Sequence, residues 1–148
     1  MKRPLLVTLA ALPVVALAIQ FIQLERTNPP VVAEPKWDSP RTRELARRAC
    51  FDCHSNQTTW PWYSRVAPVS WLVVHHVDEG REHLNFSAVD GGEHVAEIAE
   101  EIREGGMPTP DYALMHPEAR LSPAEKDSLI LGLERTFGQS AGSASKEH

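Results

Sequence analysis

Two cysteines and a histidine stand together in the stretch RRACFDCHSNQTTWPWY. Cys50, Cys53 and His54 form the pattern C-x-x-C-H, and the chain contains no other cysteine. At this spacing two thiols can add across the two vinyl groups of one haem, while the adjacent imidazole reaches the iron from the same turn. The pattern therefore predicts one haem c, attached covalently through Cys50 and Cys53, with His54 as an axial ligand of the iron.

Three other chemistries fit a pair of cysteines. A zinc site needs four ligands, commonly with a second Cys or His pair at a defined spacing, and the adjacent His75 and His76 do not obviously supply that pair. A thioredoxin-like dithiol normally lies between a strand and a helix, and no such strand is predicted here. A structural disulfide suits an exported protein but leaves the neighbouring histidine unexplained. Haem is the interpretation that uses all three residues of the motif.

A haem iron with one histidine ligand has a sixth position to fill. Met107 lies in GGMPTPDY, where two glycines end a predicted helix and two prolines stiffen the loop. We therefore expect His54 and Met107 to be the metal ligands, with packing in the core as the other interpretation of Met107. His75 or His76 as the sixth ligand would give a lower potential, and Met115 is expected in the core.

Four aromatic side chains follow the motif within a short stretch. They offer large apolar surfaces and N–H or O–H groups that can meet polar atoms at the porphyrin rim. We expect these residues to contact the haem, although core packing without haem contact fits each of them about equally well. They are Trp60, Trp62, Tyr63 and Trp71.

The N-terminal segment, residues 1–23, carries an apolar run from Leu5 to Ile22 behind Lys2 and Arg3. This pattern predicts a single-pass membrane anchor whose N-terminus stays in the cytoplasm and whose following domain lies outside. A cleaved signal peptide is the alternative, because ALA at residues 16–18 fits a small-x-small cleavage site. Either interpretation agrees with haem attachment, which takes place outside the bacterial inner membrane.

Three further segments follow the predicted anchor. Residues 24–36 are rich in proline and predict an extended linker. We expect residues 37–138 to form the haem-binding domain. Residues 139–148 are small and polar, which predicts a disordered tail. The length of 148 residues leaves room for only one modest domain.

Four helices and no convincing strand are predicted in this domain, so the expected fold class is all-α. The first begins after Asp38 or Ser39 and runs into Cys50, and the second begins after Pro68 and ends at Gly80. The third lies in EHVAEIAEEIREGG, and the fourth begins at a capping box in SPAEKDSLILGLERTF.

The charge balance indicates which partners suit the protein. The whole chain has a formal charge of −5, and the part after the first two cations has 13 basic and 20 acidic residues, which gives 13 − 20 = −7. This excess of carboxylates disfavours nucleic acid and anionic membrane surfaces as partners and favours a protein partner with a basic docking surface.

Two long stretches carry a resemblance to a known family. CFDCHSNQTTWPWYSRVAPVSWLVVHHVDEGREHLNFS and GGMPTPDYALMHPEARLSPAEKDSLI resemble the bacterial haem-binding domain family of small monohaem c-type cytochromes, over roughly residues 37–137. The resemblance implies that Cys50 and Cys53 carry the haem, that His54 is the proximal ligand and that Met107 occupies the family's methionine position. It also implies a cytochrome c-like helical domain around one haem, tethered to the membrane in the periplasm.

The expected function is that of a membrane-anchored periplasmic monohaem cytochrome c, a single-electron carrier with no catalytic residues. Its expected partners are redox proteins, together with the membrane through the N-terminal helix. A haem-based gas or redox sensor with a labile sixth ligand is one alternative. A haem peroxidase that uses His75 or His76 as its acid/base group is the other.

Overall fold

The structure is a computed structural model that describes residues 2–88 and 94–144. Within these ranges it is built from helices and contains no strand, and the one isolated bridge described there joins Ala33 to Ala88. The all-α fold class predicted from the sequence is therefore confirmed for the described part of the chain. The α-helices are α1 (Lys2–Ala18), α2 (Pro40–Ala49), α3 (Phe51–His54), α4 (Val69–His83), α5 (Val95–Glu104), α6 (Pro110–Met115) and α7 (Pro123–Ala144), and the 3-10 turns are η1 (Ile19–Phe21), η2 (Trp62–Arg65) and η4 (Pro117–Ala119).

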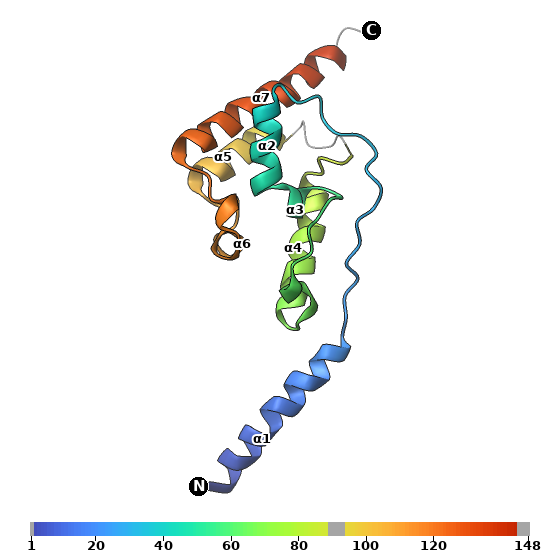
Figure 1. The fold of residues 1–148 in the computed structure, drawn as a ribbon, viewed down its shortest axis with the longest axis vertical. Coiled ribbons are helices and arrows are strands. Elements are labelled where there is room, and N and C mark those ends of the chain that lie inside the picture. The colour runs from blue at the N-terminus through green and yellow to red at the C-terminus, as the bar shows by residue number, and fades with distance from the viewer. Residues whose placement is uncertain (1, 89–93, 145–148) are drawn as a thin grey trace.

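The helices that carry the core lie at one end of the molecule. In Figure 1, α7 packs across α2 and α5, while α4 extends from α3 toward the opposite end, from which α1 projects. The core is apolar, and its residues come mainly from α2, α5 and α7 and from the segment after α4. It consists of Leu45, Ala46, Ala49, Phe51, Leu84, Phe86, Ala99, Ile102, Leu121, Leu129, Ile130, Leu133 and Phe137. Phe51 of α3 belongs to this set, and its burial fixes α3 in place.

Local features of the sequence determine where three helices begin or end. Ser39 caps α2, since its side chain accepts a hydrogen bond from the Thr42 backbone N–H at 3.1 Å. Gly105 ends α5 in the left-handed region with φ of 83°. In α7, the Ser122 backbone N–H donates to Glu125 at 2.9 Å, which completes the predicted capping box.

The second predicted helix is longer than expected. It was predicted to end at Gly80, but α4 continues to His83. Gly80 is buried inside the helix, where an added Cβ would lie 2.6 Å from the carbonyl oxygen of Cys53. The glycine therefore allows α4 to approach α3 closely, and it does not act as a C-cap.

The last helix also extends beyond its predicted end. α7 continues to Ala144 and so enters the segment 139–148, for which a disordered tail was predicted. The small residues after Phe137 do not interrupt the helical hydrogen-bond ladder, although they add little apolar surface to bury. Residues 145–148 lie outside the described residues.

The linker is extended and is bound to the domain along its length. Arg81 donates to the Thr27 carbonyl oxygen at 3.0 Å, and Arg43 forms an ion pair with Glu34 at 2.8 Å. Side chains of the domain thus fix a segment that has no regular structure of its own.

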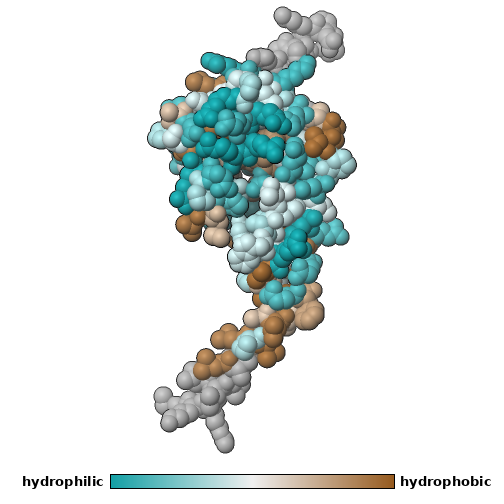
Figure 2. All heavy atoms as spheres, in the orientation of Figure 1, coloured by the Kyte–Doolittle hydropathy of each residue, from teal (hydrophilic) through white to brown (hydrophobic). Residues whose placement is uncertain are grey.

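The N-terminal apolar segment forms α1 and η1, and the described side chains of α1 are exposed. Figure 2 shows this brown helix leaving the predominantly hydrophilic domain. Among residues 2–88 and 94–144, no helix combines the length and the apolar character needed to cross a membrane. The membrane anchor remains a prediction.

Candidate functional site

The C-x-x-C-H motif forms one tight helical turn. α2 ends at Ala49, and the backbone N–H groups of Cys53 and His54 both donate to the Cys50 carbonyl oxygen, at 3.2 and 2.8 Å. Phe51, which lies between the two cysteines, is buried in the core and stacks against Phe86 at a centroid distance of 5.4 Å. The buried phenylalanine therefore anchors the turn, and the two thiols and the imidazole belong to one short rigid unit.

His54 is held in one orientation by backbone carbonyl groups of α4 and of the residue that follows it. Its Nδ1 atom lies 2.8 Å from the Gly80 oxygen and 3.2 Å from the Leu84 oxygen. Carbonyl oxygens only accept hydrogen bonds, so Nδ1 carries the proton and Nε2 keeps its lone pair. Burial lowers the pKa of His54, which favours the neutral imidazole that binds metals.

An apolar cavity of about 510 Å³ opens beside this turn. Cys50, Cys53 and His54 line one part of it, and most of the other lining residues come from α4, from α5 and from the segments that follow these two helices. The volume falls in the usual range of cofactor sites, about 300–1,000 Å³. The cavity therefore joins the motif to the other half of the domain and leaves space for a cofactor between them.

Met107 lines the same cavity, which is where the expected second axial ligand has to lie. Its backbone N–H donates to the Glu101 carbonyl oxygen at 3.1 Å, just after the turn at Gly105. Its side chain is 37% exposed, so the thioether is not buried in the core. Met115, which was expected in the core, is 54% exposed and does not line the cavity.

Both cysteines are free thiols in this structure. Burial raises the pKa of Cys50 to about 12, with a smaller contribution from Cys53. Burial followed by the charge of Asp52 raises the pKa of Cys53 to about 11. Redox-active dithiols depend on a lowered thiol pKa, so this environment disfavours a thioredoxin-like role.

The described part of the chain offers no set of ligands for zinc. There, no group of three or more His, Cys, Asp or Glu side chains is arranged to hold a metal ion. The donor set at the cavity, two thiols on one turn with a neutral imidazole, instead suits a cofactor that needs two thiols and one axial nitrogen. The residues present therefore fit a haem.

Three further histidines line the cavity. They are His76, His83 and His94, whereas His75 points outward and pairs with Glu79 at 3.2 Å. Of the two histidines named as the alternative sixth ligand, only His76 lines the cavity. His83 lies seven residues, or two helical turns, after His76, and this spacing was the pattern in the sequence that could have identified it.

The four predicted aromatic contacts do not line the cavity. Trp60 donates to Asn28 at 3.2 Å, and Trp62 is 73% exposed. Trp71 donates through Nε1 to the Ile22 carbonyl oxygen at 3.0 Å. As haem contacts these residues remain a prediction; in the structure Trp71 bonds the N-terminal segment and Trp60 bonds the linker.

Tyr63 does not line the cavity either, but it contacts a residue near it. Its hydroxyl lies 2.7 Å from Nε2 of His116, whose Nδ1 lies 3.1 Å from Glu118. The His116 ring stacks on Tyr112 at a centroid distance of 4.2 Å, and Tyr112 lines the cavity. Tyr63 is therefore connected to the cavity through His116 and Tyr112.

Besides Phe86, Tyr112 is the aromatic residue of the cavity lining that sequence reasoning missed. Its hydroxyl donates to Asp52 at 2.8 Å, which ties α6 to the motif turn. Burial, followed by the charge of Asp52, raises the pKa of Tyr112, so the phenol stays protonated. Its place in the sequence, five residues after Met107, was the only indication of this role.

The helical architecture, the apolar cavity and the donor set define the class of a small helical haem-binding protein. The sequence matches the family model described as haem-binding domain over residues 14–135. The chain therefore belongs to the haem-binding domain family, which confirms the resemblance seen in the motifs. No curated protein and no solved structure matches the chain.

Proposed function

We propose that the protein is a single-electron carrier, a monohaem cytochrome c with His54 and Met107 as axial ligands. The observation that carries this proposal is that one cavity is lined by Cys50, Cys53, His54 and Met107, although Met107 is far from the motif in sequence. When bound, the haem supplies an iron ion that cycles between the ferrous and ferric states. Covalent attachment would use the two thiols of the motif.

The residues around the cavity have separate tasks in this proposal. The Gly80 and Leu84 carbonyl groups orient the His54 ring and increase the basicity of Nε2. The turn at Gly105 and the hydrogen bond from the Met107 backbone to Glu101 hold the thioether side of the cavity. An apolar wall limits the access of water, which favours a higher reduction potential.

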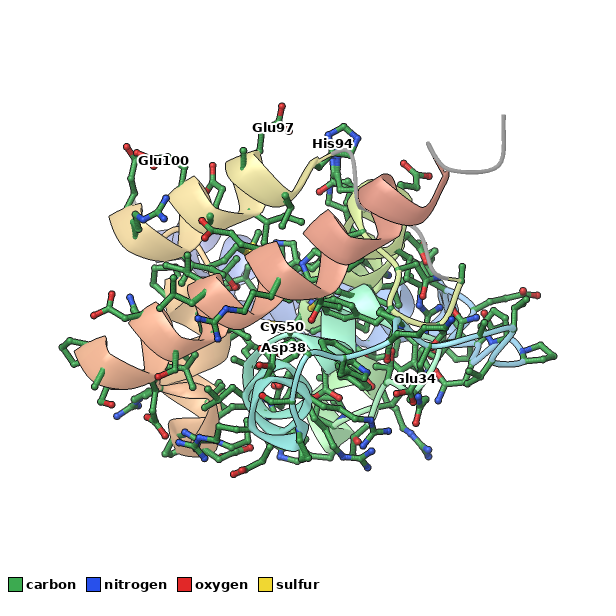
Figure 3. All side chains as sticks on the ribbon, turned by 90° about the horizontal axis from the view of Figure 1, so that it is seen from above. Glu34, Asp38, Cys50, His94, Glu97 and Glu100 are labelled. Atoms are coloured by element: carbon green, nitrogen blue, oxygen red, sulfur yellow. The ribbon has the colours of Figure 1, made fainter. Side chains whose placement is uncertain are left out.

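Docking of a redox partner would use the acidic character of the domain. Figure 3 shows Glu97 and Glu100 projecting outward from α5, and their side chains are largely exposed. Glu97 also lines the cavity. A partner with a basic surface would be steered toward this helix and so toward the cofactor.

The proposed setting is the periplasmic side of the bacterial inner membrane, with residues 1–23 as a single-pass anchor. The support is the apolar, exposed character of the described side chains of α1, together with the two cations, Lys2 and Arg3, that precede the apolar run in the sequence. Such a tether would raise the local concentration of membrane-bound redox partners.

A second candidate is a haem-based sensor or a peroxidase with an open sixth position. The partial exposure of Met107 favours it, as does the presence of three more histidines at the cavity. A displaced thioether would leave room for a diatomic gas or for peroxide, with His76 as the nearest equivalent of a peroxidase acid/base group.

The optical spectrum of the protein, expressed together with haem-attachment enzymes, tests both candidates. An electron carrier is expected to be six-coordinate and low-spin, and to show in its ferric form the weak red band that Met-to-iron coordination produces. Carbon monoxide added to the reduced protein should then cause no prompt spectral change. A high-spin spectrum with rapid carbon monoxide binding would contradict the electron carrier, and turnover of peroxide would then separate a peroxidase from a sensor.

A further inference from the structure

Gln20 joins the N-terminal segment to the haem-binding domain by a pair of hydrogen bonds. Its side-chain Nε2 donates to the Ala67 carbonyl oxygen, and the Ala67 backbone N–H donates to Gln20 Oε1, both at 3.0 Å. One amide side chain thus satisfies both backbone groups of one residue. Because two parallel bonds resist rotation better than one, this contact fixes the direction in which α1 leaves the domain.

Two more contacts strengthen the same junction. Trp71 donates to the Ile22 carbonyl oxygen at 3.0 Å, and Arg26 donates to the Ser64 carbonyl oxygen at 3.1 Å. The N-terminal segment is therefore bound to Ala67 and to the first turn of α4, and the start of the linker is bound to η2. We refer to residues 60–72 as the tryptophan end of the domain.

The tryptophan end exposes apolar side chains that have no cover among the described residues. Trp62 is the most exposed, and Val66, Val69 and Leu72 are also exposed. On the adjoining segment, Phe21 is 89% exposed. Figure 2 shows the apolar surface of α1 leading up to the domain, and the Gln20–Ala67 contact brings the end of this surface next to the tryptophan end.

The charge at this junction differs from that of the rest of the domain. Residues 20–28 and 60–72 contain two arginines, Arg26 and Arg65, and one carboxylate, Glu25, whereas the chain as a whole has an excess of acidic residues. Arginine next to exposed tryptophan and aliphatic side chains matches a lipid headgroup layer, in which phosphates lie above the acyl chains. A basic protein partner would match the acidic remainder of the domain instead.

We propose that the tryptophan end rests in the headgroup region of the lipid bilayer, and that the Gln20–Ala67 contact holds it there. This inference rests on the proposed anchoring by residues 1–23. The indole rings of Trp62 and Trp71 would occupy the interface, where amphipathic aromatic side chains are enriched. The haem-binding domain would then stand in one orientation on the membrane, instead of moving freely on its linker.

The experiment uses the full, haem-loaded chain labelled with 5-fluorotryptophan and reconstituted in nanodiscs of phosphatidylethanolamine and phosphatidylglycerol. The fluorine NMR signals are assigned by replacing each tryptophan with phenylalanine in turn. The reduced protein is then measured with a lipid that carries a nitroxide near its headgroup, and separately with a water-soluble gadolinium chelate. Trp37, which packs against the core, is the internal reference.

The proposal predicts that the nitroxide lipid abolishes the Trp62 signal while the chelate leaves it intact. Loss of the Trp62 signal to the chelate, with the signal intact beside the nitroxide lipid, would overturn the proposal while the protein still elutes with the nanodiscs. A protein that does not elute with the nanodiscs would overturn the membrane anchor itself, and this inference with it. The two failures are therefore distinguishable.

A matched pair of variants tests the role of the amide contact. Gln20→Ala removes both hydrogen bonds to Ala67 and should make the Trp62 signal sensitive to the chelate. Gln23→Ala is the control, because the hydrogen bonds described for the Gln23 side chain, to the Gln20 carbonyl oxygen and from Arg26 at 3.4 Å, do not reach residues 60–72, and it should leave the Trp62 response unchanged. An unchanged response in Gln20→Ala, or an equal change in both variants, would overturn the assignment of Gln20 as the contact that orients the domain.

Discussion

The Nδ1 atom of His54 lies 2.8 Å from the carbonyl oxygen of Gly80. This contact depends on the close approach of α4 to α3, because a Cβ at Gly80 would lie 2.6 Å from the Cys53 carbonyl oxygen. One glycine therefore permits the helix contact and also supplies the acceptor that orients the proposed axial ligand.

The substitution Gly80→Ala tests this relationship. The added methyl group meets backbone atoms that cannot turn aside, so the two helices must separate, with an expected loss of unfolding free energy of about 1–3 kcal/mol. The His54 ring would lose its orientation, and the haem content should fall. Chemical denaturation and the haem-to-protein ratio measure the two effects.

Gly138→Ala is the matched control for that variant. No atom lies within 4 Å of a Cβ built at Gly138, which is exposed in α7. The change should leave the haem content unaltered and raise the unfolding free energy slightly, by about 0.5–1 kcal/mol, because alanine favours the helix. Equal destabilisation by both substitutions would contradict the explanation based on close approach.

Replacement of both thiols, Cys50→Ala with Cys53→Ala, should abolish covalently bound haem. The physical reason is that the two thioether bonds need these sulfur atoms, which are the only ones from cysteine in the chain. Haem staining after denaturing electrophoresis measures the outcome, and each single variant should retain haem through one bond. Haem that stays with the denatured double variant would show that attachment does not use the motif.

Met107→Ala should leave the haem attached and change its sixth ligand. The thioether that lines the cavity is removed, so the red band of the ferric protein should disappear and carbon monoxide should bind the reduced protein rapidly. Met115→Ala is the control, since Met115 is exposed and lies outside the cavity lining. If the spectrum of Met107→Ala equals that of the parent, another residue is the sixth ligand, and His76, His83 and His94 become the next variants to make.

The ion pair between Glu34 and Arg43 predicts a dependence of stability on pH. Hydrogen bonding to Arg43 lowers the pKa of Glu34 from 4.5 to about 2. A carboxyl group with a lowered pKa in the folded state stabilises the fold above its ordinary pKa, and this contribution is lost as the pH falls from about 4.5 through 2. We expect it to be about 1 kcal/mol, below the full linkage value, because both side chains are partly exposed.

Glu34→Gln measures that contribution. The variant should be less stable than the parent at neutral pH, and the difference should disappear as the pH approaches 2. Glu44→Gln is the control, because Glu44 and its partner Arg41 are both about half exposed and their pair should contribute little. A difference between parent and Glu34→Gln that is constant over the whole pH range would contradict the linkage argument.

The sequence predicted several helices well because short-range features define them. Ser39 and the box at Ser122 and Glu125 cap their helices within four residues, and Gly105 ends α5 within one turn. Gly80 was misleading, because the same residue type that ends one helix serves in another for contact with a distant element. Only the position of α3 against α4 distinguishes the two uses.

The candidate site was predicted in part for the same reason. The motif at Cys50, Cys53 and His54 occupies a single turn, so its spacing alone defines its geometry. Composition singled out the tryptophans, but composition cannot say which surface a tryptophan covers. The contact of Trp60 with the linker and the contact of Trp71 with the N-terminal segment join residues more than thirty positions apart along the chain, and no local pattern records such a contact.

The sequence by itself determined the helical class, the haem motif and Met107 as its candidate partner, because helix caps, motif spacing and glycine-proline turns act over a few residues. Only the tertiary structure decided that Met107 and His54 line one cavity, that His76, His83 and Tyr112 join them, and that the tryptophan end receives the N-terminal helix. These relationships depend on which helix faces pack together, and packing is settled by the burial of the whole apolar set at once.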